Sequence, residues 1–483
     1  MPLPCLSFPS PDASPRRTPV PACGRHRGSA PGIFRRAAAL ALSMLALGAA
    51  VAGADGDPDP AFWTGGEVVL QLPFDMNFGG LDADAAGNLA LAFDSPLLEG
   101  VDRGYWATVG DDSLGAYCEI DPGTGPGQDV RVLDLAFDDL GRLIALVMLH
   151  FDETLDLFML VAYDFPACVL VPSFGVSGVV VLPTDPDYES DGFFDVSALS
   201  DGHLLVTGRT WNGLPATPLG RPLALEIGPA GNAITEFSPP FGSWEESAVA
   251  AEAVRASNGH TVLAVDEWDD SRDFVLLDFA ADGTYLGPLG IPFDLWVEGS
   301  DGPFALAALD GDRLVVVGNA RQYPEGDPSP STTAAVAMAR WPPGGGALEL
   351  DTSFSGDGKW DGRVEHNATF FDVLRQGADR FVAVGSSWLP DQTQKILLAR
   401  FLLDGSLDTT FGGTGTGLFT EDLPGTWWER ATRVVPQNGR LVLGGIADIH
   451  FGVRAIGLVR RTSDLIFQGG FEQLNPPDWQ VGP

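Results

Sequence analysis

Tryptophans and carboxylates recur together in the connections that precede several predicted strands of this chain. The residues that we select as ligand-binding candidates are Trp244, Trp296, Trp427, Trp428, Glu245, Glu298 and Asp301. Aromatic faces beside carboxylates match the apolar faces and hydroxyl groups of a sugar. The alternative is that the tryptophans close the ends of a hydrophobic core.

A wider set of acids occupies the same connections and could focus a negative potential on one face of the protein. The set comprises Asp185, Asp187, Glu189, Asp191, Asp195, Glu245, Glu246, Asp294, Glu298, Asp301, Glu421, Asp422 and Glu429. Such a face would attract cations or basic partners and repel nucleic acid, whose binding requires a basic footprint. Acids scattered over loops for solubility are the competing interpretation.

Calcium is the one cofactor for which the sequence offers a ligand pattern. Asp187, Glu189 and Asp191 place oxygen ligands at alternate positions before Gly192, and Ca²⁺ accepts six to eight oxygens in flexible geometry. The match to an EF-hand loop fails at the twelfth position, which is Ala198. No histidine set, nucleophile elbow or phosphate-binding glycine loop is present, so we assign no catalytic residue.

The elements that must position these residues belong to a unit that recurs seven times. Each copy has an apolar strand, a turn rich in Asp, Gly and Asn, and a second apolar strand. The residues at the equivalent position after the turn are Asn88, Arg142, His203, His260, Arg313, Arg380 and Arg440, spaced 53 to 67 residues apart. We call them the register marks. A period of this size indicates units that bury their apolar faces only by stacking on neighbours.

Four short strands in each unit predict an all-β fold, a seven-bladed β-propeller of repeats of about 60 residues over residues 55–462. A third strand follows each hairpin, and a turn of the form Asp-x-x-Phe opens the fourth, as in Asp59-Pro60-Ala61-Phe62. We expect the N-terminal strand at 66–70 to complete the last blade and close the ring. An open β-solenoid is the alternative.

Two segments carry a family resemblance. Residues 351–359 (DTSFSGDGK) and 398–412 (LARFLLDGSLDTTFG) resemble the delta-60 repeat family of exported bacterial β-propeller proteins. The match is specific over about residues 340–460 and degenerate before that. It implies a secreted propeller and brings no established catalytic residues. In the C-terminal tail, 463–483, residues 466–472 (IFQGGFE) resemble a short C-terminal motif of exported proteins, with a final edge strand as the alternative.

The first 54 residues differ in charge from the rest. They hold six arginines and one acid, and the remainder has 22 basic and 64 acidic residues, a net charge of −42. Arg35-Arg36 followed by an alanine-rich run and Ala52-Gly53-Ala54 is typical of a signal peptide, and we expect cleavage after Ala54. An uncleaved anchor is the alternative, although the run is shorter than the roughly 20 residues of a membrane-spanning helix.

Export implies an oxidising compartment, in which Cys118 and Cys168 could form a disulfide between adjacent units. Two free buried thiols are the alternative. We therefore expect a secreted, periplasmic or cell-surface protein, monomeric and without a membrane span after cleavage. The favoured function is non-enzymatic binding of a protein or glycan on the cell surface through an acidic, aromatic-containing face. The alternative is a polysaccharide hydrolase or lyase using paired carboxylates in the central channel.

Overall fold

The computed structural model describes residues 55–71, 75–96, 102–123, 128–152, 155–183, 192–211, 220–240, 248–267, 273–293, 301–322, 331–362, 367–449 and 453–463. These residues belong to one compact unit, Leu45–Pro483. The signal-peptide prediction for residues 1–54 and the tail from residue 464 onward lie outside the described residues. No helix in the described part of the chain is long and apolar enough to cross a membrane.

The described residues form an all-β structure of antiparallel sheets, with one short 3-10 helix, η1 (Ser200–Gly202). The first sheet contains β2 (Asn77–Ala83), β3 (Leu89–Pro96), β4 (Asp102–Val109) and β5 (Leu114–Glu119). The second contains β6 (Asp129–Phe137), β7 (Arg142–Asp152), β8 (Leu155–Asp164), β9 (Val169–Leu170) and β10 (Val179–Val181). The third contains β11 (Gly192–Ala198), β12 (Leu204–Trp211), β13 (Gly220–Ile227) and β14 (Ala233–Phe237).

The later sheets follow the same order along the chain. The fourth contains β15 (Ala248–Arg255), β16 (Thr261–Glu267), β17 (Phe274–Phe279) and β18 (Tyr285–Ile291). The fifth contains β19 (Asp301–Leu309), β20 (Arg313–Gln322), β21 (Ser331–Arg340), β22 (Glu349–Leu350) and β23 (Lys359–Trp360). The last sheet contains β24 (Ala368–Gln376), β25 (Arg380–Trp388), β26 (Gln394–Leu402), β27 (Leu418–Glu421), β28 (Thr426–Gln437), β29 (Arg440–Ile449), β30 (Val453–Thr462) and β1 (Glu67–Leu70).

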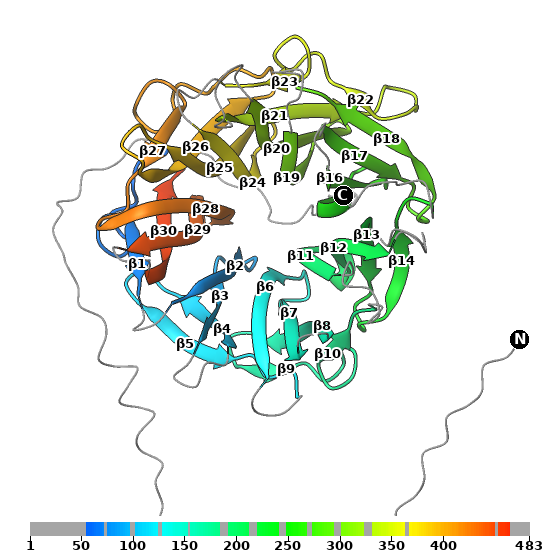
Figure 1. Cartoon of the computed structure of the whole chain (residues 1–483), viewed down its shortest axis with the longest axis vertical. Coiled ribbons are helices and arrows are strands. Elements are labelled where there is room, and N and C mark those ends of the chain that lie inside the picture. The colour runs from blue at the N-terminus through cyan, green and yellow to red at the C-terminus, as the bar shows by residue number, and fades with distance from the viewer. Residues whose placement is uncertain are drawn as a thin grey trace, which may run out of the picture. The chain divides into compact units, whose positions relative to one another are not determined.

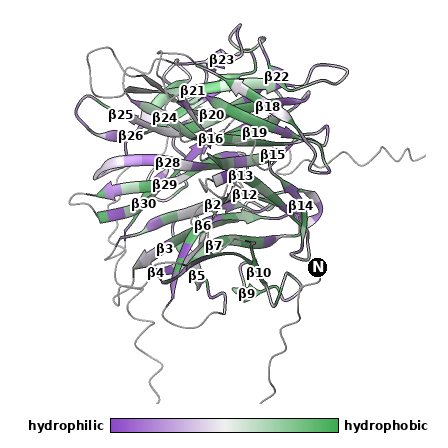
Figure 2. Ribbon diagram, turned by 45° about the vertical axis from the view of Figure 1, so that its right-hand side comes forward, coloured by the Kyte–Doolittle hydropathy of each residue, from purple (hydrophilic) through white to green (hydrophobic). Residues whose placement is uncertain are grey.

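Within the last sheet, two groups of strands are joined by a single pairing between Gln394 and Trp428. Figure 1 shows the sheets arranged radially, with β2, β6, β11, β19, β24 and β28 nearest the centre. This is the architecture of a β-propeller. Figure 2 shows hydrophobic residues along the strands and hydrophilic residues concentrated toward their ends and connections.

The structure contains the seven hairpins that we predicted at the register marks. At each mark, two consecutive antiparallel strands pair on either side of the turn. Their turn chemistry explains the repeated Asp, Gly and Asn residues. Asn438 and Gly439 have φ of 49° and 77°, and Asp312 has φ of 57°. Two-residue hairpin turns need such positive φ values, which Gly, Asn and Asp adopt at the lowest cost.

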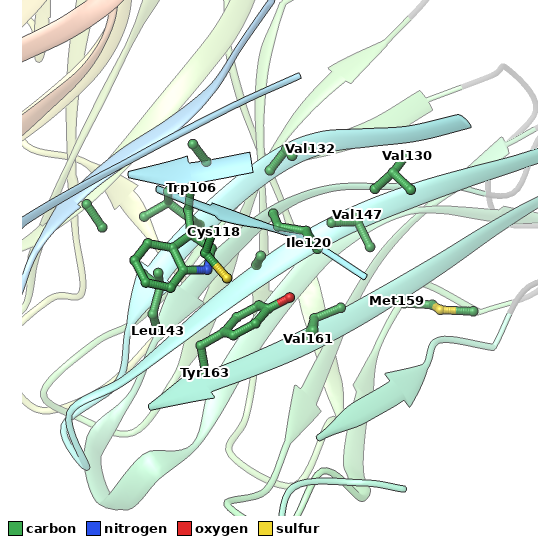
Figure 3. Packing of buried hydrophobic residues seen from close by; sticks show 14 of the residues in the cluster. Trp106, Cys118, Ile120, Val130, Val132, Leu143, Val147, Met159, Val161 and Tyr163 are labelled. Carbon is green, nitrogen blue, oxygen red and sulfur yellow. The ribbon is translucent and has the colours of Figure 1, made fainter. Parts of the chain in front are cut away.

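The apolar strands bury both faces, since side chains from neighbouring sheets share one core cluster. Trp106 of β4, for example, packs in a cluster with Leu143 and Tyr163 of the second sheet. Trp106 is fully buried, and its ring lies 5.7 Å from the ring of Tyr163. Figure 3 shows these side chains meeting between the two sheets, with Cys118 among them.

The Asp-x-x-Phe turns and the register-mark arginines form one structural motif. In the sixth repeat, the Asp408 carboxylate lies 2.9 Å from both Arg380 and Arg400. The guanidinium of Arg400 stands 4.6 Å from the centre of the Phe411 ring. In the fifth repeat, Asp351 lies 3.1 Å from Arg313. The motif therefore ties the start of the second strand to the turn that opens the fourth.

In the seventh repeat, this motif is supplied by the N-terminal segment. Asp59 contacts Arg440 and Arg460, and Arg460 lies 4.6 Å from the centre of the Phe62 ring. The predicted N-terminal strand is β1, which pairs antiparallel with β30 from Glu67 opposite Val459 onward. The two ends of the propeller segment are therefore joined by both backbone and side-chain contacts.

Candidate functional site

Two adjacent indoles are exposed at the beginning of β28. Trp427 and Trp428 keep 54% and 48% of their surface exposed. The pairing of β28 with β29 shifts between Thr426 and Trp428, so Trp427 is the extra residue of a β-bulge. The ring of Trp428 lies 5.9 Å from that of Trp388 at the end of β25. The bulge therefore places two successive tryptophans at the surface beside a third.

A buried glutamate anchors this part of β28. Glu429 follows Trp428 and is fully buried. Its carboxylate accepts hydrogen bonds from the Leu423 N–H at 3.0 Å and from the Thr426 hydroxyl, and it lies 3.3 Å from the Lys395 ammonium. Burial raises the pKa of Glu429 despite these bonds, which act to lower it. The glutamate fixes the strand from its inner side while the tryptophans remain accessible.

Arg430, two residues beyond Trp428, adds a cation to the same surface. It is exposed, and its guanidinium lies 5.8 Å from the centre of the Phe371 ring on β24. Phe371 in turn lies 5.2 Å from Phe304 on β19, in edge-to-face geometry. Although Arg430 is exposed, the partial loss of water around its guanidinium lowers its pKa, as does the charge of Arg454, while the carboxylate of Asp448 acts in the opposite direction.

We call Trp388, Trp427, Trp428, Arg430 and Phe371 the tryptophan–arginine surface. Alternate residues of a strand point to the same side, so Trp428 and Arg430 project together while Glu429 points inward. An exposed aromatic patch of this kind marks a binding surface more often than a random part of the exterior. Flat apolar rings and a guanidinium can bind a ligand that has both an apolar face and hydrogen-bond acceptors.

The structure describes three of the seven candidate ligand-binding residues. Trp427 and Trp428 lie together on β28. Asp301, the first residue of β19, is 3% exposed and accepts the Phe293 N–H at 3.0 Å, so its carboxylate serves an internal hydrogen bond. The other candidates lie outside the described residues, namely Trp244, Trp296, Glu245 and Glu298.

The calcium candidates Asp187, Glu189 and Asp191 also lie outside the described residues. Within the described residues, no group of three or more His, Cys, Asp or Glu side chains is arranged to hold a metal ion. Asp195 and Glu429, which belong to the predicted acidic face, are buried in strands. These two acids therefore make internal contacts instead of contributing to an exposed ring.

A second charged cluster, at the centre of the propeller, is absent from the sequence-based candidates. Every innermost strand has a β-bulge, and the residues that directly follow the bulges are Gly80, Asp134, Asp195, Glu252, Ala305, Asp372 and Arg433. We call the five charged members the axial cluster. Each acid stands eight residues before its register mark, and Arg433 stands seven before. That nearly constant offset is the signal by which the sequence could have revealed the cluster.

The axial acids link each innermost strand to the next. Asp134 accepts the Val196 N–H at 3.0 Å, Glu252 accepts the Leu306 N–H at 2.7 Å, and Asp372 accepts the Val434 N–H at 2.6 Å. In all three cases the donor directly follows the axial position of the next repeat. An innermost strand has one edge without a neighbouring strand, and its N–H groups require other acceptors. The carboxylates meet that requirement.

Arg433, on β28 of the last repeat, binds two of these acids from β6 and β11. Its Nη2 atom lies 2.9 Å from Asp134 and 2.7 Å from Asp195, and its Nε atom lies 3.3 Å from Asp134. Their side chains are 3% and 9% exposed, against 26% for Arg433. The acids raise the pKa of Arg433 although the surrounding protein acts to lower it.

Burial raises the pKa of several acids in and beside the axial cluster. The pKa rises to about 8 for Glu252 and to about 6 for Asp372, and it lies well above the usual range for Asp195. Asp82, which accepts the Phe137 N–H at 2.7 Å, has a pKa of about 7. Removal of water is the leading cause in all four, and neighbouring carboxylates add to it. Enclosed acids that bind backbone N–H groups primarily support the fold.

A disulfide joins Cys118 of β5 to Cys168 in the turn before β9. Their Cα atoms are 5.7 Å apart, within the usual range for a disulfide. The bond links the sheets of the first and second repeats, beside the buried ring of Trp106. The two cysteines are 50 positions apart in the sequence.

No family model matches this chain, and no curated protein matches it in sequence. Several solved structures are similar to it at low identity. An ulvan lyase, a polysaccharide lyase, shares 10% identity and a TM-score of 0.45 over 80% of this chain and 95% of its own.

Two further structures lie at a comparable distance. A protein of unknown function from Dyadobacter fermentans has 12% identity and a TM-score of 0.43, covering 84% of this chain and all of its own. A lectin from Burkholderia pseudomallei has 12% identity and a TM-score of 0.43, covering 81% and 99%. At this level of similarity the functions of these proteins do not transfer to this chain.

Proposed function

We propose that this protein is an exported β-propeller that binds a glycan through the tryptophan–arginine surface. The observation that carries the proposal is the exposure of Trp427 and Trp428 next to Trp388 on a strand anchored by buried Glu429. Exposing two indoles to water is unfavourable unless a ligand covers them. A rigid strand end keeps their rings oriented for stacking without an added loss of conformational entropy on binding.

The size of this surface favours a glycan over a protein partner. A stable protein interface covers about 800 Å² per partner and some 20 to 30 residues. The other large exposed hydrophobic side chains of the described residues, such as Tyr117, Val176 and Ile234, belong to other sheets. A small aromatic patch with polar neighbours has the size and chemistry of a binding site for a sugar-sized ligand.

We also propose that the propeller has seven blades closed into a ring by β1, and that the chain belongs to the delta-60 repeat family. The seven register-mark hairpins and the pairing of β1 with β30 support the count and the closure. Export to the periplasm, the cell surface or the medium is supported by the arginine-rich and alanine-rich leader. We propose a monomer whose glycan partner lies on a cell surface.

The test is a glycan array probed with the protein purified from cells that express the full chain. We expect binding to a defined subset of glycans, weakened at least tenfold in Trp428→Ala and Trp427→Ala. Tyr117→Ala is the matched control, because Tyr117 is also exposed but lies on β5. All variants should keep the wild-type melting temperature within a few degrees. Absence of binding to any glycan would refute the proposal, and release of oligosaccharides would indicate the hydrolase or lyase alternative.

A further inference from the structure

The backbone of Arg430 pairs with β29, but its side chain has no hydrogen bond or ion pair within the part of the chain that the structure describes. The guanidinium makes a cation–π approach to Phe371, with Arg454 and Asp448 in electrostatic reach. Most arginines that the structure describes pair with carboxylates, as Arg400 does with Asp408 and Arg460 with Asp59. Among the described residues, the exposed guanidinium of Arg430 has no ion-paired carboxylate, although the chain has a net charge of −37.

The aromatic neighbours hold this guanidinium in place on the surface. Arg430 stands two residues from Trp428, whose ring packs against Trp388, and it lies over Phe371. Stacking on an aromatic face orients the planar guanidinium and leaves its N–H donors free to point outward. Five donors in a fixed fork match the two oxygens of a carboxylate or the three of a sulfate.

We propose that the ligand of the tryptophan–arginine surface is an acidic glycan, whose carboxylate or sulfate group pairs with Arg430 while its sugar rings stack on Trp427 and Trp428. This inference rests on the proposed glycan-binding function. Charge complementarity selects the class of glycan, because Arg430 is the group on this surface able to bind an oxyanion with two parallel hydrogen bonds.

Asp448 completes the recognition of the sugar. It lies on β29 directly opposite Trp428 and is partly exposed. A sugar hydroxyl beside Trp428 can donate to the carboxylate of Asp448. The surface then provides an acceptor for a hydroxyl and a donor for an oxyanion within one strand pair.

The test compares matched acidic and neutral glycans by titration against the protein from full-chain expression. One arm uses oligogalacturonate and its carboxyl-reduced form, and the other uses a sulfated galactan and its desulfated form, alongside the hits of the array. We expect at least one acidic member to bind about tenfold tighter than its neutral counterpart, as a charge-assisted hydrogen bond implies. Which arm responds distinguishes a carboxylate from a sulfate ligand.

Three variants assign that preference to Arg430. Arg430→Gln should remove the tenfold preference and its salt dependence, and leave the weaker neutral binding. Arg430→Lys should recover part of the preference, since it restores charge without the planar fork. Arg131→Gln is the control, because Arg131 is also exposed but lies on β6 beside Asp102.

Each outcome decides between the two proposals. Equal binding of acidic and neutral glycans, or an acidic preference that survives Arg430→Gln, would overturn the inference and leave the glycan-binding function standing. Binding confined to neutral glycans would likewise overturn the inference of an acidic ligand and leave the glycan-binding function standing. Failure of every glycan to bind would overturn the proposed function itself, and the inference with it.

Discussion

Asp59 and Arg460 form an ion pair of 2.8 Å although 401 positions separate them in the chain. Both side chains are at most 4% exposed. The sixth repeat makes the same contact between Asp408 and Arg400, only eight residues apart. The seventh repeat is thus assembled from both ends of the propeller segment. The Asp–Arg pair that is local in the sixth repeat joins residues distant in sequence in the seventh.

Asp59→Asn should destabilise the protein by roughly 3 kcal/mol, because it removes the buried carboxylate that pairs with both Arg440 and Arg460 and leaves Arg460 only the exposed carboxylate of Asp111. Chemical unfolding should show the loss, and hydrogen exchange should accelerate first in β1 and β30. Asp379→Asn, which removes a carboxylate that is 66% exposed and 3.7 Å from Arg380, should cost less than about 0.5 kcal/mol. If the two variants reduced the free energy of unfolding equally, Asp59 would not stabilise the contact between the N-terminal segment and the last repeat.

Stability should fall as the pH rises from 5 to 8. The folded-state pKa values of about 6 for Asp372, 7 for Asp82 and 8 for Glu252 lie above those of unfolded carboxyls, near 4. The folded state therefore binds more protons than the unfolded state in this window, and the free energy of unfolding decreases as these protons are lost. Melting temperatures at pH 5, 6, 7 and 8 would measure the slope.

Glu252→Gln should flatten that slope and raise the stability at pH 8. The glutamine side-chain oxygen can still accept the Leu306 N–H, while the cost of burying a charge disappears. Glu119→Gln is the matched control, because Glu119 is 52% exposed. A slope that is unchanged in Glu252→Gln would show that the axial acids do not control the pH dependence.

Arg433→Met should reduce the free energy of unfolding more at pH 8 than at pH 5. Without the guanidinium, Asp134 and Asp195 share an enclosed site with no cation, which costs roughly 3 kcal/mol when the acids are charged. Protonation of Asp195, whose pKa is raised, relieves that repulsion at lower pH. The double variant Arg433→Met with Asp195→Asn should recover part of the loss, and urea titrations at both pH values would reveal whether the two changes are coupled.

The Cys118–Cys168 disulfide should contribute about 4 kcal/mol to the free energy of unfolding, since it closes a loop of some 50 residues in the unfolded chain. Peptide mass mapping without reductant should recover the linked peptides. The double variant Cys118→Ser with Cys168→Ser should melt at a lower temperature and lose its response to reductant. Two free thiols in the mapped peptides would exclude the bond.

The glycine, asparagine and aspartate turns and the apolar strands were sufficient to predict the seven hairpins and the partnership of the N-terminal strand with the last repeat. The hairpins follow from local rules, because positive-φ turns and continuous apolar strands specify hairpins that stack on both faces. The N-terminal partnership follows from the repeat, because the last unit lacks a following copy and the strand at 66–70 precedes the first full one. Trp427 and Trp428 were selected from the sequence as aromatics in a connection between strands, whereas the structure places them exposed at the start of β28.

The axial cluster illustrates what sequence reasoning missed. Asp134, Asp195 and Arg433 are up to 299 residues apart, and nothing local distinguishes them from surface charges. Their offset of seven or eight residues from the register marks becomes meaningful only when the repeats are arranged radially, because equivalent positions then converge on one axis.

The sequence by itself determined the repeat, its turns and its alternation of strands, since these depend on backbone preferences and apolar patterning within some 60 residues. The tertiary structure decided which charges are buried. Asp301 and Glu429 became internal acceptors, Asp59 became a partner of Arg460, and Arg430 was left exposed without a carboxylate. Pairing of charges depends on which strands meet in space, and that is settled only when the sheets pack around the axis.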